Sequence, residues 1–84
     1  MQNIEHYKGC ILDARSHELR DGSGWNAEVY IAQPHGGSVL ETQFVLQETF
    51  PTSDAAIDAA LQVGRHKVQV GFEPKVVVPD RPNG

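Results

Sequence analysis

The sequence predicts an α+β domain in which a three-stranded antiparallel sheet is followed by one C-terminal helix. Residues 25–33 alternate apolar and polar side chains between two glycine-containing turns, which is typical of a strand with one buried face. Residues 53–70 carry apolar residues at helical spacing behind a capping sequence. Because the turns between the expected strands are short, we expect hairpins and therefore antiparallel pairing.

The first strand is expected at residues 8–19, where the alternation is imperfect. Cys10, Leu12 and Ala14 share one face, whereas Ile11 falls on the other face among charged residues. A β-bulge, or a sheet partly covered on both faces, would explain this conflict. A turn at residues 20–24 follows, with two glycines beside aspartate and serine.

The second and third strands are expected at residues 25–33 and 39–47, separated by a turn at residues 33–38. In the second strand, the outward positions are Asn26, Glu28, Tyr30 and Ala32. In the third strand, the inward positions are Leu40, Phe44 and Leu46, with Glu41, Gln43 and Gln47 facing outward.

The helix is expected at residues 53–70. Thr52 or Ser53 can cap its first turn, and Gly71 and Pro74 end it. Gly64 inside the helix costs about 1 kcal/mol relative to alanine, so we expect it to permit close approach of the helix to the sheet.

These elements predict one domain over residues 1–72 and a flexible, proline-rich tail over residues 73–84. Within the tail, Val76, Val77 and Val78 are candidates for a short additional edge strand. The expected core consists of Leu12, Val29, Ile31, Phe44, Leu46, Phe50, Ile57, Ala60, Leu61 and Val68, with Trp25 at its margin.

The formal net charge is −4 over 84 residues, which works against broad attraction to nucleic acid or anionic membrane. No apolar run has the length of a signal peptide or a transmembrane helix, and the single cysteine suits a reducing compartment. We therefore expect a cytoplasmic protein without a membrane partner.

The histidines and the cysteine do not predict a metal site or a cofactor. None of His6, Cys10, His17, His35 and His66 has the close paired spacing of a zinc motif. In an extended strand, His6 and Cys10 would lie roughly 13 Å apart. His17 and His35 could approach each other across turns, although nothing in the sequence requires it.

Catalysis by Cys10 is the main enzymatic alternative. A reactive thiolate needs a nearby histidine or positive charge, and His6 and Lys8 are close in sequence. A cysteine in an apolar strand is more often a small packed hydrophobe, and no other catalytic constellation is present. We expect that the protein is not an enzyme.

Several segments resemble a group of small uncharacterised bacterial proteins, a domain of unknown function. The resemblance runs through Tyr7-Lys8-Gly9, His17-Glu18-Leu19, residues 24–31, Thr49-Phe50-Pro51-Thr52, residues 55–60 and Gly64-Arg65. It covers residues 6–72 and implies a shared fold, but no activity that can be carried over.

The layout of residues 24–29, a third strand and residues 49–52 before an alanine-rich helix is also similar to plant ethylene-response-type DNA-binding domains. Phage integrase arm-binding domains share that sheet-plus-helix layout. In those families the exposed sheet face carries arginine and tryptophan in the major groove. Here the corresponding outward positions include Glu28 and Glu41, which would repel phosphate, so we expect shared layout without shared function.

The sequence does not determine the function. The first expectation is a non-catalytic protein-interaction module that self-associates or binds another protein. Its candidate surface is Ile11, Tyr30 and the valines Val76, Val77 and Val78, because one helix covers only one face of the sheet. The alternatives are a nucleic-acid-binding or regulatory protein, and a small enzyme that uses Cys10.

Overall fold

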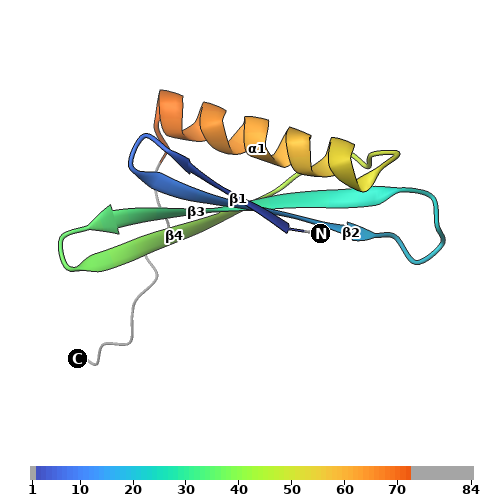
Figure 1. Ribbon diagram of the computed structural model, residues 1–84, viewed down its shortest axis with the longest axis horizontal. Coiled ribbons are helices and arrows are strands. Elements are labelled where there is room, and N and C mark those ends of the chain that lie inside the picture. Colours follow the sequence, from blue (N-terminus) through green and yellow to red (C-terminus); the bar gives the residue numbers. More distant parts are fainter. Residues whose placement is uncertain (1, 73–84) are drawn as a thin grey trace.

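Four antiparallel strands and one helix make up the described part of the chain, residues 2–72 of a computed structural model (Figure 1). The elements are β1 (Gln2–Tyr7), β2 (Cys10–Glu18), β3 (Trp25–His35), β4 (Ser38–Val45) and α1 (Ser53–Val70). The strands form one sheet in the order β1-β2-β3-β4, so each hairpin pairs neighbours in sequence. The α+β class, the antiparallel sheet and the single helix are confirmed for these residues.

The prediction of three strands was wrong, because β1 precedes the first expected strand. Lys8 and Gly9 both have positive φ, 48° and 82°, and they form a two-residue hairpin turn that pairs Tyr7 with Cys10. The strand expected at residues 8–19 therefore begins at Cys10. It pairs with β1 and β3 in continuous register, without a bulge, and leaves Ile11 41% exposed on the face opposite the helix.

The turn of the β3–β4 hairpin is shorter than the expected turn at residues 33–38, because β3 continues through Pro34 to His35. Gly36, with φ of 62°, and Gly37 make the two-residue connection. Proline is tolerated at position 34 because the pairing of β2 with β3 ends at Ala32, so no neighbour on that side needs its missing N–H.

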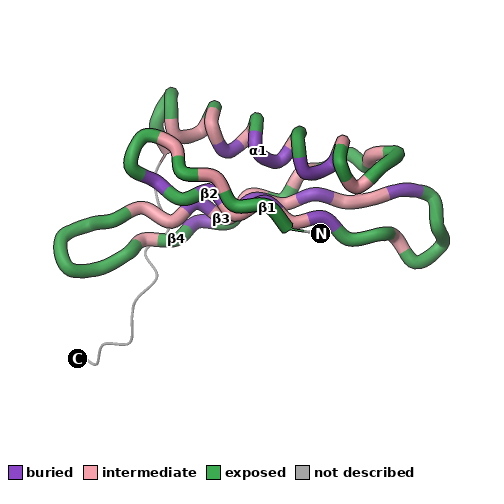
Figure 2. The backbone as a smooth tube through the Cα atoms, in the orientation of Figure 1, coloured by how far each residue is buried: buried purple, intermediate pink, exposed green. Residues whose placement is uncertain are grey.

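The core lies between α1 and one face of the sheet, and the buried residues line the sides that face each other (Figure 2). Of the predicted core, Leu12, Val29, Ile31, Ile57, Ala60 and Leu61 are buried, and Phe44, Leu46, Phe50 and Val68 pack against them in partly buried positions. Trp25 is also partly buried, as expected for the margin. The buried residues outside that prediction are small: Cys10, Ala14, Ser16, Gly24, Ala27, Thr42, Ala56 and Gly64.

The helix has the predicted bounds. The Thr52 hydroxyl accepts a hydrogen bond from the Ala55 amide at 3.1 Å, and the Gly71 amide donates to the Lys67 carbonyl at 2.9 Å. A Cβ atom at Gly64 would lie 3.2–3.4 Å from side-chain atoms of Val29 and Leu12, so close approach of the helix to the sheet at Gly64 is confirmed. The described helix lacks the long apolar stretch that a bilayer crossing requires.

The helix lies across β2 and β3, with a lesser contact to β1. A bidentate salt bridge links the helix to β1, in which Arg65 donates two hydrogen bonds to the Glu5 carboxylate, at 2.7 and 2.8 Å. The helix is therefore centred over β2 and β3 rather than over β4. The tail of residues 73–84, including the strand predicted at Val76, Val77 and Val78, lies outside the described residues.

Candidate functional site

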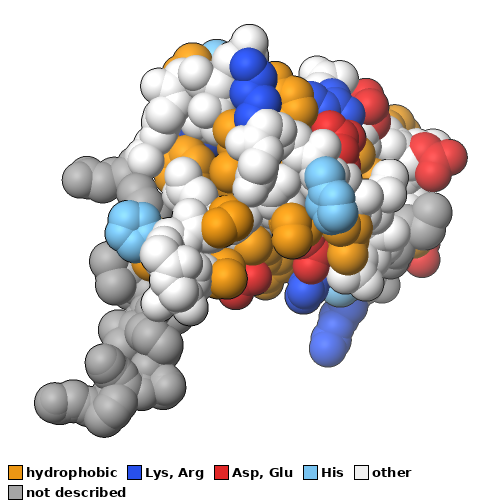
Figure 3. Space-filling model, turned by 60° about the vertical axis from the view of Figure 1, so that its left-hand side comes forward, with side chains coloured by type: hydrophobic (Ala, Val, Ile, Leu, Met, Phe, Trp, Pro, Cys, Tyr) orange, Lys and Arg blue, Asp and Glu red, His pale blue; other side chains and the backbone are white. Residues whose placement is uncertain are grey.

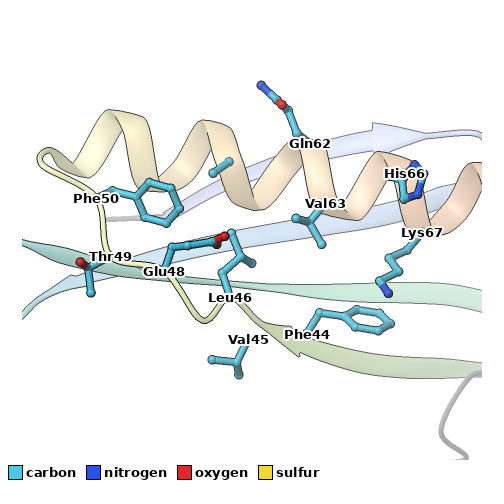
Figure 4. Close-up of a pocket in the computed structure, with 11 residues that line it drawn as sticks. Phe44, Val45, Leu46, Glu48, Thr49, Phe50, Gln62, Val63, His66 and Lys67 are labelled. Carbon is cyan, nitrogen blue, oxygen red and sulfur yellow. The ribbon is translucent and has the colours of Figure 1, made fainter.

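An apolar groove of about 840 Å³ runs between α1 and the β4 side of the sheet (Figure 4). One wall is formed by β4 and the segment that follows it, with Phe44, Leu46 and Phe50 as its large apolar side chains. The opposite wall comes from α1 and consists of Ala59, Gln62, Val63, His66 and Lys67. The groove exists because the helix is centred over β2 and β3 rather than over β4.

The groove has a structured end at Phe44. The Lys67 ammonium lies 4.8 Å from the centre of the Phe44 ring, and Phe72 meets the same ring edge-on at 5.5 Å. Lys67 and His66 make this end basic, whereas Glu48 from the β4 side is acidic. A bound segment would therefore find an apolar floor with charged groups of both signs at the rim.

Within residues 2–72, the outer edge of β4 carries backbone groups that no other strand pairs with. The Leu46 amide donates to the Ala27 carbonyl at 3.0 Å, which fixes the even-numbered residues of β4 as those bonded to β3. The N–H and C=O groups of Val39, Glu41, Gln43 and Val45 consequently point away from β3. In the described part of the chain, β4 has no strand on that side.

β4 has one feature that protects this edge, the charge of Glu41. Strand edges are usually blunted by several such features, which are charged residues, especially lysine, proline, bulges and short length. β4 is eight residues long, pairs with β3 in continuous register, and has Glu41 as its one charged residue. Val39 and Val45 are also 58% and 57% exposed. The edge is therefore competent to pair with another strand.

The sheet face opposite α1 is different, because a polar network covers its centre. Arg15 donates to the Asp13 carboxylate at 2.8 Å and lies 4.5 Å from the centre of the Tyr30 ring. Gln43 donates to Glu28 at 2.7 Å and to the Tyr30 hydroxyl at 3.1 Å. Most polar groups at the centre of this face are thus already bonded within the molecule.

The hydrogen-bond network on this face also lowers the pKa of one of its carboxyl groups, Asp13. Burial opposes ionisation of Asp13, but hydrogen bonds from Arg15 and Gln2 outweigh it, so the pKa of Asp13 lies below its ordinary value. Glu28 and Glu41 add negative charge on the same face, against one arginine. On the side of the molecule seen in Figure 3, hydrophobic side chains are likewise interspersed with polar and charged ones.

The structure brings two of the predicted interaction residues together. Ile11 and Tyr30 lie on the same open face in the neighbouring strands β2 and β3. Ile11 is exposed, whereas Tyr30 is half-buried under Arg15 and held by Gln43. The other predicted surface residues, Val76, Val77 and Val78, lie outside the described residues.

The placement of His6 and Cys10 on one extended strand was wrong, because the Lys8-Gly9 turn separates them. His6 pairs with Ile11 on the open face, while Cys10 faces the helix and is only 6% exposed. His17, paired with Asn26, and His35 lie at opposite ends of β3, so they do not approach each other. Residues 2–72 contain no group of three or more side chains able to hold a metal ion.

Sequence reasoning missed both the weakly protected edge of β4 and the groove between β4 and α1. The signal for the edge was present, since residues 38–45 contain one charge and no proline. The groove had no such signal, because it depends on the lateral position of α1 over the sheet. Val63 and Lys67, at the edge of the helix's apolar stripe, are the residues that this position turns toward β4.

No family model matches the chain, and neither the curated proteins nor the solved structures contain a match. The resemblances to small bacterial proteins and to sheet-plus-helix DNA-binding domains therefore stay predictions.

Proposed function

We propose that the protein is a non-catalytic protein-interaction module that self-associates or binds a protein segment along β4. The observation that carries this proposal is the combination of a strand edge left unpaired by the described residues with an apolar groove on the same side of the molecule. Added strands gain affinity from main-chain hydrogen bonds and specificity from pockets for alternate side chains. β4 offers the first through Val39, Glu41, Gln43 and Val45.

The opposite edge of the sheet supports the choice of β4. β1 is polar, with Gln2, Asn3, Glu5 and His6 among its six residues, and Glu5 is bound to Arg65 of the helix. The sheet therefore has one polar edge tied to α1 and one more apolar edge beside an open groove.

Nucleic-acid binding has less support. The arginine of the open face is paired with Asp13 and stacked on Tyr30, and the carboxylates of Glu28 and Glu41 would repel phosphate. For location, we propose the cytoplasm, because the one cysteine of the sequence suits a reducing compartment.

The experiment compares three immobilised baits in extract of the source organism: the natural chain, Glu41→Pro and Ile4→Pro. Proline at position 41 removes an N–H that points away from β3, and proline at position 4 removes the equivalent outward N–H of β1. We expect a partner that the natural chain and Ile4→Pro retain and Glu41→Pro loses. The proposal is wrong if no retained protein, including a second copy of the chain, distinguishes Glu41→Pro from the other two baits.

A further inference from the structure

We propose that the partner on β4 is a second copy of this chain, joined edge to edge by antiparallel β4 strands in a register centred on Thr42. This inference rests on the proposed function and deepens it by naming the partner and its alignment. Three properties of β4 carry it: which backbone groups are free, which side chains the register sets opposite each other, and where the helix lies.

The free backbone groups restrict the register. An antiparallel pair exchanges hydrogen bonds only between residues whose N–H and C=O groups point toward each other. In β4 these are Val39, Glu41, Gln43 and Val45, because the even-numbered residues bond to β3. Two copies can therefore pair only odd residue with odd residue.

Among the registers that satisfy this rule, the one centred on Thr42 gives the best side-chain pairs. On the open face it sets Val39 opposite Val45 and Glu41 opposite Gln43, and on the helix-facing side it sets Leu40 opposite Phe44. Every apolar residue thus meets an apolar residue, and the charged residue meets a neutral amide.

The neighbouring registers are worse on the same criteria. A register centred on Glu41 places two carboxylates directly opposite each other, which is destabilising, and sets Val39 against Gln43. A register centred on Gln43 sets Glu41 against Val45 and leaves Val39 beyond the last pair within the strand. The Thr42 register is also the one that covers both highly exposed valines.

The helix does not obstruct this pairing. The twofold axis of two edge-paired antiparallel strands is perpendicular to the sheet, so both α1 helices lie on the same face. Each helix is centred over its own β2 and β3, away from the outer edge of β4. The groove of each copy then borders Leu40 of the other copy, so the apolar floor is continuous across the junction.

Sedimentation of the purified protein from about 1 µM to about 1 mM tests whether a dimer forms. We expect a concentration-dependent dimer. By symmetry Glu41→Pro acts twice in each dimer, so we expect its dissociation constant to rise at least ~10-fold, while that of Ile4→Pro is unchanged. Circular dichroism checks that both variants fold.

Disulfide formation then tests the register, because Cys10 is buried and an introduced thiol is the accessible one. An equimolar mixture of Glu41→Cys and Gln43→Cys should give mainly the mixed disulfide, since these positions are opposite each other. Dominant self-cross-linking of Glu41→Cys or of Gln43→Cys would identify another register and overturn this one.

The remaining outcomes separate this inference from the proposed function. A monomer at every concentration, together with a different partner that Glu41→Pro fails to retain, overturns the second copy as occupant and leaves the interaction module standing. A monomer without any such partner overturns both. A dimer that survives Glu41→Pro but is lost in Ile11→Lys uses the open sheet face and overturns the β4 junction.

Discussion

Replacing Gly64 with alanine is expected to destabilise the protein, although alanine is the better helix former. The substitution favours the helix by about 1 kcal/mol. The added Cβ, however, would lie 3.2 Å from Cγ2 of Val29 and 3.3 and 3.4 Å from the methyl carbons of Leu12. Both side chains are completely buried and cannot move into solvent.

The expected size follows from these two opposing effects. Inserting a methyl group into a packed core costs about 1–3 kcal/mol, which exceeds the gain in helix propensity. We therefore expect a net loss of about 1 kcal/mol in the free energy of unfolding, which corresponds to a fall of about 4–8 °C in Tm for a domain of this size.

The sign of the effect should change when room is made for the methyl group. In a Val29→Ala background the nearest atom is absent and Leu12 can shift into the vacated space. Gly64→Ala should then be neutral or stabilising, by up to about 1 kcal/mol. The coupling between the two substitutions is the quantity that tests the close approach.

Urea unfolding of the four variants in this cycle measures the coupling. Trp25 is the only tryptophan and is partly buried, so its fluorescence reports unfolding. Protein concentration must be held fixed, because self-association stabilises the folded state by mass action. An increase in stability for Gly64→Ala in the natural background, or the same effect in both backgrounds, would refute this account of the helix–sheet contact.

Three further predictions concern other contacts. The hydrogen bonds from Arg65 hold the pKa of Glu5 below its ordinary value of about 4.3. Glu5→Gln should therefore lower the free energy of unfolding by about 0.5–1 kcal/mol at pH 7. This loss should disappear as the pH falls from about 4.3 through the folded-state pKa of Glu5. An equal loss at pH 7 and pH 3 in urea unfolding would contradict the prediction. Gly24→Ala should cost about 2–3 kcal/mol in the same assay, because φ is +156° and the new Cβ would lie 2.8 Å from the backbone oxygen of Phe50. Gly37→Ala is the control, because Gly37 has open space around it and the substitution should change the free energy of unfolding by no more than about 0.5 kcal/mol. Equal effects of the two substitutions would argue against the clash at Gly24. Finally, the Cys10 thiol should react with a thiol reagent at least ~100-fold more slowly in the native state than in denaturant, and rapid native labelling would reopen the enzymatic alternative.

The helix and the central strands were predictable because local signals and tertiary packing agree there. Thr52 caps α1 and Gly71 ends it, as the sequence indicates. The alternation of β3 matches its burial, since the inward residues Ala27, Val29 and Ile31 are buried and the outward residues between them are only partly buried.

β1 was not predictable from alternation because it is an edge strand with a polar inward face. Its one large aliphatic residue, Ile4, is 54% exposed, and its inward Glu5 is neutralised by Arg65, which is 60 residues away in sequence. The turn before β2 gave only a partial signal, since Lys8 occupies a positive-φ position more often held by glycine or asparagine.

The candidate site was predictable only in part, because contacts between residues far apart in sequence also shape it. The pattern of β3 correctly placed Tyr30 on the open face, and β2 placed Ile11 beside it. The exposure of Tyr30 depends on long-range contacts from Arg15 and Gln43 that no local pattern contains. The groove beside β4 likewise depends on the lateral position of the helix.

The central claim, that β4 pairs with a strand of a second copy, is tested most directly by amide hydrogen exchange of the natural protein. The amides of Glu41 and Gln43 point away from β3, so in a monomer they should exchange as fast as solvent-exposed groups. We predict that their protection rises with protein concentration, while that of the outward-facing amides of Ile4 and His6 on β1 does not. Unprotected exchange at Glu41 and Gln43 at every concentration would contradict the claim.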